Sequence, residues 1–265
     1  MKRYYIIAKT DSFSQSVAQQ LKTKLNAISL IEDKYNPDLL IICGGDGKVL
    51  RALHYYIKLI DKIHVFSIMT GTLGFSCDFN PNELDELVES IKNENYTIDK
   101  QPLLKVTINR NHRYSDVFYA INEFRVENRI RTCVVDVYLN DELFETFRGN
   151  GLIVSSPFGS TAYNRSLGGA IIMPTIKAMQ LTEIAGIHHN LYRSLNSPLV
   201  LDGNVKIKLK IAEPKKCILG IDHRLLNNDF VSDVSIELAN KYVKFIHFKD
   251  ISFFDRLKKS FIIEK

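Results

Sequence analysis

Apolar residues change their spacing near residue 100 of this 265-residue chain, and that change most constrains the fold. Before this point, short apolar runs alternate with stretches in which apolar residues recur every three or four positions, which predicts strands alternating with helices. After it, apolar and polar residues alternate over many short stretches, as in strands with one buried face. We therefore expect an α/β + β chain, with a Rossmann-like α/β domain and a mainly antiparallel β domain.

The expected first domain covers residues 1–100 and begins with a strand–helix alternation. Its run at 39–43 is apolar at every position, as in a parallel strand that is buried on both faces. Asn80, Pro81 and Glu83 suit the cap, the first-turn proline and the capping-box acid of a helix. The predicted strands are 4–8, 39–43 and 64–69.

The expected second domain covers residues 101–247, and its alternating segments predict strands. Asn140 and Asp141 suit a hairpin turn between two of them. Only the region 160–187 has loop and helix character, and the segment 255–261 predicts a short helix near the chain end. The predicted strands are 103–109, 116–126, 133–139, 142–147, 151–156, 198–201, 205–211, 233–238 and 242–248.

Charge and length argue against several classes of protein. The 35 Lys and Arg residues exceed the 30 Asp and Glu residues by only five, and the lysines at 205–211 alternate with apolar residues as on the solvated face of a strand. A mild positive charge suits an enzyme that acts on polyanions. No segment is long and apolar enough for a secretory signal or a membrane span. We expect a cytoplasmic protein that binds neither nucleic acid nor membranes.

Cysteine and histidine spacing gives no sign of a metal site. The cysteines stand far apart and form no CxxC pair, so we expect buried thiols in a reducing compartment. His188 and His189 are adjacent, but neighbours in sequence rarely ligate one ion together. The cysteines are Cys43, Cys77, Cys133 and Cys217.

A Gly-Gly-Asp-Gly turn at 44–47 follows the apolar strand 39–43 and precedes a helical stripe. It is not a Walker A loop, because Ile42 and Val49 occupy the positions that require a glycine and a hydroxyl residue. Glycines at the carboxyl end of a strand let the backbone approach phosphate, and the helix start attracts it. Asp46 would then bind magnesium or accept the proton of an attacking hydroxyl, both of which are tasks in phosphoryl transfer. The alternative is a plain Asp-Gly turn.

Further polar segments downstream suit a nucleoside. An asparagine side chain at 122 can pair with an adenine edge, and the carboxylate of Glu123 can accept hydrogen bonds from ribose hydroxyls. Each residue alone is equally consistent with an ordinary turn after a strand. The segment 155–170 adds a Pro-x-Gly turn and a run of hydroxyl side chains at Ser160, Thr161, Tyr163 and Ser166.

Together these segments resemble the bacterial NAD kinase family, in the compact type of Gram-positive bacteria. The resemblance implies an N-terminal α/β domain, a C-terminal β-sandwich-like domain, and a tail at 248–265 that returns to the first domain. It also implies phosphate transfer from ATP or inorganic polyphosphate, with an accompanying divalent cation such as Mg²⁺, to the adenosine 2′-hydroxyl of NAD. Homotetramers with the NAD site at a subunit interface are implied too. The matching segments are 44–47, 70–75, 102–104, 122–123, 147–152, 161–170, 178–185, 197–200 and 221–224.

The resemblance assigns a role to each matching position. Asp46 would be the catalytic residue that orients the 2′-hydroxyl and accepts its proton. Gly44 and Gly45 would lie along the phosphate donor, and we add Lys48, which departs from the family, as a candidate for the same contact. No residue is assigned as a protein ligand of a metal. The residues assigned to substrate binding are Gly47, Asn122, Glu123, Arg148, Asn150, Thr161, Ala162, Tyr163, Asn164, Arg165, Ser166, Ala185 and His223.

Several positions depart from the family pattern. Lys48 replaces a threonine, and it either contacts the donor phosphates or points outward along the helix. Asn150 replaces an aspartate, which weakens any hydrogen bond to the nicotinamide amide or to a ribose hydroxyl. Thr72 and Ser76 replace a histidine and an aromatic residue, and His223 could be a surface histidine held by its neighbour.

Two alternative functions follow from these departures and from the glycine turn. A catalytically impaired paralogue that senses a dinucleotide would explain Lys48 and Asn150. A lipid or diacylglycerol kinase would share the Gly-Gly-Asp-Gly turn, but the segments 147–152 and 161–164 argue against it.

Overall fold

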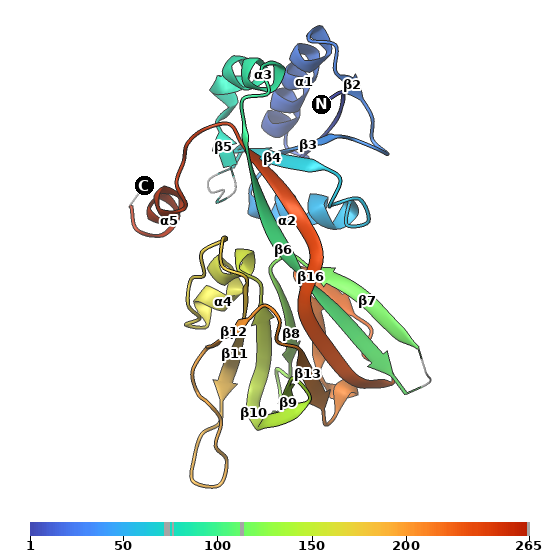
Figure 1. The fold of residues 1–265 in the computed structure, drawn as a ribbon, viewed down its shortest axis with the longest axis vertical. Coiled ribbons are helices and arrows are strands. Elements are labelled where there is room, and N and C mark those ends of the chain that lie inside the picture. The colour runs from blue at the N-terminus through green and yellow to red at the C-terminus, as the bar shows by residue number, and fades with distance from the viewer. Residues whose placement is uncertain (72–74, 76, 112–113, 264–265) are drawn as a thin grey trace. The chain divides into compact units, whose positions relative to one another are not determined.

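The computed structural model describes residues 1–71, 75, 77–111 and 114–263 (Figure 1). The chain divides into two compact units, one formed by 1–101 with 242–265 and the other by 102–241. Among the described residues, no helix is both long and apolar enough to span a membrane.

The first unit is a parallel sheet with helices, as the alternating pattern predicts. β3 (Leu39–Cys43) pairs with β1 (Arg3–Ala8) and with β4 (His64–Ile68), while β1 also pairs with β2 (Ile31–Glu32). β4 further pairs with β5 (Cys77–Phe79) and with the end of β16 (Val231–His247). Every residue of β3 is fully buried, which confirms the prediction from its unbroken apolar run.

Helices of the first unit begin where the sequence indicates. The predicted capping box between Asn80 and Glu83 is present, and the 3₁₀ turn Pro81–Glu83 leads into α3. Ser252 and Asp255 form another capping box at the start of α5, which confirms the helix predicted near the chain end. The helices are α1 (Ser12–Ala27), α2 (Asp46–Tyr55), α3 (Leu84–Lys92) and α5 (Phe253–Phe261).

The second unit is mainly antiparallel β, which confirms the predicted fold class. Its central order is β15-β14-β8-β10-β9-β13-β16, with β11 paired to β10 and β12, and β6 paired to β7 and β16. The strands are β6 (Thr97–Arg110), β7 (Ser115–Ala120), β8 (Glu123–Glu127), β9 (Cys133–Leu139), β10 (Glu142–Ser155), β11 (Ala178–Gly186), β12 (Leu199–Asp202), β13 (Ile207–Ile211), β14 (Ile218–Ile221) and β15 (Arg224–Leu226). Short helical turns lie at Phe158–Thr161, Tyr163–Ser166 (α4) and Pro214–Lys216.

Some predicted strand boundaries are wrong. The segments 142–147 and 151–156 form one strand, β10, as the last two predicted strands form β16. The segment 116–126 is instead divided between β7 and β8. The region 160–187 is not only loop and helix, because 178–186 is strand β11. The turn at Asn140 and Asp141 is confirmed, and both residues have the positive φ, 50° and 68°, that a tight hairpin between β9 and β10 requires.

Candidate active site

The glycine turn joins β3 to α2 in the geometry that the sequence predicts. Gly44 donates its N–H to the Ile68 carbonyl at 3.1 Å, which ties the turn to β4. Gly45 caps α2, and Asp46 is the first residue of that helix. The unpaired N–H groups of a helix start favour negative charge, so this turn can hold both the Asp46 carboxylate and an incoming phosphate oxygen.

Asp46 is exposed, and its carboxylate has a fixed contact. The Phe75 N–H donates to its Oδ2 at 3.1 Å. An exposed carboxylate with a defined orientation can accept a proton from a substrate hydroxyl.

Two glycines of the turn have different surroundings. A Cβ placed on Gly44 would lie 2.7 Å from the Cβ of Lys48, so only glycine fits beneath that side chain. A Cβ placed on Gly47 would meet nothing within 4 Å. Folding therefore does not demand a glycine at 47, whereas close approach by a ligand would. The role of the Lys48 ammonium group stays a prediction.

A second group of predicted residues surrounds the turn between β7 and β8. The Asp222 carboxylate accepts three backbone N–H groups there, from Ile121 at 2.9 Å, Asn122 at 2.8 Å and Glu123 at 3.0 Å. Asp222 itself has φ 51° and donates its N–H to the Glu123 carbonyl at 3.0 Å. The resemblance implies only that Asp222 and His223 form an Asp-His pair near the same site, yet Asp222 fixes the backbone of the Asn122-Glu123 turn.

Two side-chain oxygens of this turn are buried and lack hydrogen-bond partners among the residues that the structure describes. Glu123 is 4% exposed, and neither its Oε2 nor the Oδ1 of Asn122 has a hydrogen-bond partner in the described part of the chain. Burial, and then the Asp222 charge, raise the pKa of Glu123 to about 8, although Arg125 opposes the change. A buried acceptor without a partner costs roughly 1–3 kcal/mol, so such atoms in a native protein point to a polar ligand.

The hydroxyl-rich segment packs directly on the same turn. Ser156 donates its hydroxyl to the Ile121 carbonyl at 2.6 Å and its N–H to the Asn122 carbonyl at 2.8 Å. A Cβ on Gly159 would lie 2.1 Å from the Asn122 oxygen, so this close contact requires glycine. The second unit therefore brings the start of the segment 155–170 onto the Asn122-Glu123 turn.

The other predicted substrate contacts of this segment, together with His223, differ in exposure. Tyr163 is exposed, with its ring 5.9 Å from the Arg125 guanidinium carbon. Asn164 is fully buried, and its Oδ1 accepts the Thr182 hydroxyl at 2.8 Å. Thr161 and Ala162 are partly buried, whereas Arg165, Ser166 and His223 are exposed. All these assignments to a substrate stay predictions.

Arg148, Asn150 and Ala185 form a separate group on β10 and β11. Gly149 pairs with Gly186, which places Arg148 and Ala185 on adjacent strands, and the Arg148 guanidinium lies 4.5 Å from the Tyr192 ring centre. Glu123 pairs with Ser155, seven positions along β10 from Arg148. At about 3.3 Å per residue, Arg148 lies roughly 23 Å and Asn150 roughly 17 Å from Ser155 along the strand. The two groups therefore do not contact one another within this chain.

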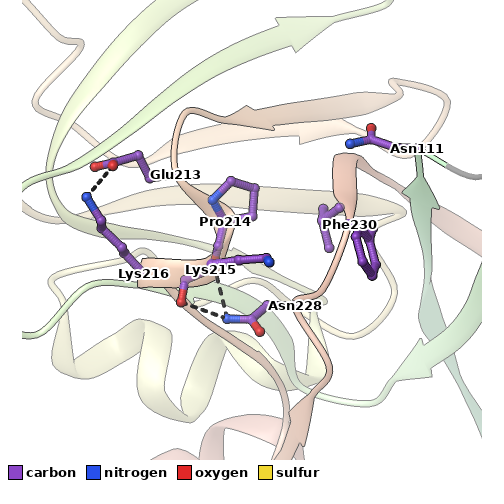
Figure 2. A pocket seen from close by; sticks show the side chains of 8 residues that line it. Asn111, Glu213, Pro214, Lys215, Lys216, Asn228 and Phe230 are labelled. Atoms are coloured by element: carbon purple, nitrogen blue, oxygen red, sulfur yellow. Dashed lines mark hydrogen bonds and ion pairs between the residues drawn. The ribbon is translucent and has the colours of Figure 1, made fainter.

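A pocket elsewhere in the second unit holds none of the predicted residues. Figure 2 shows its lining, in which Asn228 donates to the backbone carbonyls of Pro214 and Lys215 at 3.1 and 3.4 Å. Lys216 pairs with Glu213, and the Lys215 ammonium lies 5.3 Å from the Phe230 ring centre. These polar groups are engaged with one another, so nothing in the pocket selects a ligand.

The remaining predictions concern metals and the segment around residues 72–76. Over the described ranges, no cluster of three or more His, Cys, Asp or Glu side chains could hold a metal ion. Thr72 and Ser76, in the segment 70–75 and beside it, lie outside the described residues.

Comparisons with known proteins agree over almost the whole chain. Family models described as "ATP-NAD kinase N-terminal domain" and "ATP-NAD kinase C-terminal domain" match residues 7–96 and 121–248. An NAD kinase of Lysinibacillus sphaericus is 36% identical over 260 residues, with 98% of each chain covered. An NAD kinase of Staphylococcus aureus is 38% identical over 263 residues, covering 98% of this chain and 97% of that protein.

Solved structures share the fold. A yeast NADH kinase complexed with NADH superposes with a TM-score of 0.84 at 19% identity, covering 98% of this chain and 87% of the other. An NAD kinase from Archaeoglobus fulgidus in complex with ATP gives a TM-score of 0.77 at 24% identity, covering 97% and 98%. The family models and the bacterial relatives bear out the resemblance seen in the motifs, and nothing in them favours a sensor or a lipid kinase. The chain belongs to the NAD kinase family.

Proposed function

We propose that this protein is an NAD kinase, which transfers a phosphate from ATP or inorganic polyphosphate to the adenosine 2′-hydroxyl of NAD and yields NADP. The observation that carries the proposal is the Asp46 carboxylate, exposed at the start of α2 in a glycine turn where phosphate can approach. The bacterial relatives named above are similar in sequence to this chain over nearly its full length, which supports the same activity.

The glycine turn would serve the phosphate donor and the attacking hydroxyl together. Donor phosphates would pass over Gly44 and approach the backbone N–H group of Gly45 at the start of α2, and Mg²⁺ would arrive bound to ATP as part of the substrate. Asp46 would orient the 2′-hydroxyl and accept its proton as the oxygen bonds to the γ-phosphorus. The bond from that phosphorus to the bridging oxygen would break, and ADP would leave.

The Asn122-Glu123 turn would hold the adenosine half of NAD. The buried Oδ1 of Asn122 and Oε2 of Glu123 need donors, and the adenine amine and the ribose hydroxyls supply them. Because Asp222 fixes the backbone of the turn, both acceptors are oriented before the ligand arrives.

The nicotinamide half would be held by Arg148, Asn150 and Ala185 of another copy in a homotetramer. The separation of roughly 17–23 Å along β10 supports a site completed across a subunit interface. Mixing two inactive variants, Glu123→Ala and Arg148→Ala, under conditions that exchange subunits should restore part of the activity. Mixtures that stay inactive would refute the shared site.

The activity is tested by measuring NADP formed from NAD with MgATP and, separately, with polyphosphate. Asp46→Asn should lower kcat by at least about 100-fold while NAD binding measured by calorimetry is retained. A wild-type protein that binds NAD but makes no NADP with either donor would refute the proposed function. An unchanged rate in Asp46→Asn would refute only the role of Asp46.

A further inference from the structure

The backbone of Phe75 lies between Asp46 and an arginine of the C-terminal helix. Its N–H donates to Asp46 Oδ2 at 3.1 Å, and its carbonyl accepts the Arg256 Nη1 at 3.1 Å. All three residues belong to the unit formed by 1–101 and 242–265. The orientation of the Asp46 carboxylate is therefore linked to α5 through the backbone of a single residue, Phe75.

Arg256 is held by a buried charge cluster. Its Nη2 pairs with Asp78 Oδ1, and the other Asp78 oxygen lies 2.9 Å from the His247 Nδ1. The Asp78 side chain is 2% exposed and that of Arg256 10% exposed. Burial opposes ionisation of Asp78, but His247 and Arg256 outweigh it and lower its pKa. A buried ion pair contributes little net stability compared with apolar packing, but its geometry fixes the direction of the guanidinium.

The ring of Phe75 is held by the same helix. It packs against Phe253 and Phe261 of α5, with ring centres 5.8 and 6.2 Å apart. The side chain and the carbonyl of Phe75 thus both contact α5, and the N–H that reaches Asp46 belongs to the same residue. Losing the Arg256 contact would leave the backbone of Phe75 less firmly held. Arg256 is not one of the residues that we expect to contact NAD or the phosphate donor.

We propose that Arg256 is a positioning residue for phosphoryl transfer, which anchors the backbone of Phe75 through its carbonyl so that the N–H of the same residue holds the Asp46 carboxylate against the 2′-hydroxyl. The proposal rests on the proposed function. Misplacing a reacting group by about 1 Å costs roughly 100-fold in rate. Because Arg256 contacts neither substrate in this account, its loss should lower kcat and leave KM unchanged.

Arg256→Lys tests the proposal with little risk to folding. A lysine keeps a positive charge beside Asp78 but cannot donate in a fork to Asp78 and the Phe75 carbonyl together. We expect kcat to fall roughly 10- to 100-fold, with KM for NAD and for ATP within about twofold of wild type. The matched control is Lys249→Met, which removes ion pairs of the same chain end to Glu83 at 2.8 Å and Glu86 at 3.6 Å without reaching Phe75. It should keep the wild-type kcat.

A double-variant comparison separates positioning from general weakening of the fold. If Arg256 acts through Asp46, adding Arg256→Lys to Asp46→Asn should change the residual rate by less than about twofold, measured with an enzymatic cycling assay that amplifies NADP. The proposal is overturned by a wild-type kcat in Arg256→Lys, by an equal loss in Lys249→Met, or by the same fold-loss in both backgrounds. Absence of NADP formation by the wild-type protein would instead overturn the proposed function.

Discussion

Replacing Glu123 by glutamine should stabilise the protein at alkaline pH and weaken its binding of NAD. Burial holds the pKa of this carboxyl at about 8 in the folded chain, against an ordinary value of 4.5. Between these values the unfolded chain releases the proton while the folded chain keeps it, so stability is lost as pH rises. The difference corresponds to roughly 5 kcal/mol above pH 8, because each pKa unit is worth about 1.4 kcal/mol.

Glutamine is uncharged at every pH, so the variant does not lose stability as the pH rises. The free energy of unfolding of Glu123→Gln should therefore exceed that of wild type by roughly 2–5 kcal/mol at pH 9, and by less than about 1 kcal/mol at pH 5. Urea unfolding of both proteins at pH 5, 7 and 9, without nucleotide, measures the difference. The control is Glu127→Gln, which removes a carboxylate that pairs with the same Arg125 at 3.0 Å, and we expect no alkaline stabilisation from it.

Binding gives the second half of the same prediction. If ribose hydroxyls donate to the ionised Glu123, the affinity of wild type for NAD should rise as pH goes from 6 to 8, and Glu123→Gln should lose roughly tenfold in affinity at pH 8. Calorimetric titration with NAD measures both. A variant that is no more stable than wild type at pH 9 would refute the reasoning about burial. Unchanged affinity would refute only the contact with ribose.

Other substitutions test the turns on which the proposal depends. Gly47→Ala should raise the free energy of unfolding by roughly 0.5–1 kcal/mol, since its Cβ meets nothing within 4 Å; NADP formation should still fall at least about tenfold, and full activity would show that no ligand approaches there. Gly44→Ala should instead destabilise the chain by roughly 1–3 kcal/mol in urea unfolding, because its Cβ would lie 2.7 Å from that of Lys48. Asp222→Asn should lower the free energy of unfolding by roughly 2–4 kcal/mol and weaken NAD binding, since an amide replaces a carboxylate that accepts three N–H groups; wild-type urea midpoints would refute its role in the turn.

The spacing of apolar residues predicts most of the fold. It fails for strands in which contacts with distant residues require glycines or buried polar side chains. β10 was divided in two because glycines interrupt its alternation, yet a Cβ on Gly151 would lie 2.1 Å from the Val126 carbonyl. The glycine therefore permits close strand contact and does not end the strand. β11 was missed because polar residues occupy its buried positions. Gln180 is fully buried there and bonds both the N–H and the carbonyl of Ala170, a partner that no local pattern reveals.

The residues that are expected to contact substrate are easier to predict from the sequence than the residues that position them. Asp46, Asn122 and Glu123 stand in short motifs whose chemistry can be judged directly. Asp222 acts on residues about 100 positions earlier in the chain, and Arg256 reaches the carbonyl of Phe75 across 181 positions. Neither arginines nor aspartates are rare on surfaces, so only the folded structure separates these two from solvated charges.

The arrangement around Asp222 also explains how buried, unpartnered acceptors can persist in a folded protein. Asp222 satisfies the backbone N–H groups of the turn, so the turn keeps its shape even though Asn122 Oδ1 and Glu123 Oε2 lack donors. The free-energy cost of leaving these two acceptors without hydrogen bonds is then present only in the ligand-free state. A ligand that donates hydrogen bonds to both acceptors removes this cost, and the backbone of the turn does not have to reorganise. Part of the binding free energy therefore comes from satisfying acceptors that lack partners in the free protein. On this account, loosening the turn through Asp222 should lower affinity even though Asn122 and Glu123 themselves are unchanged.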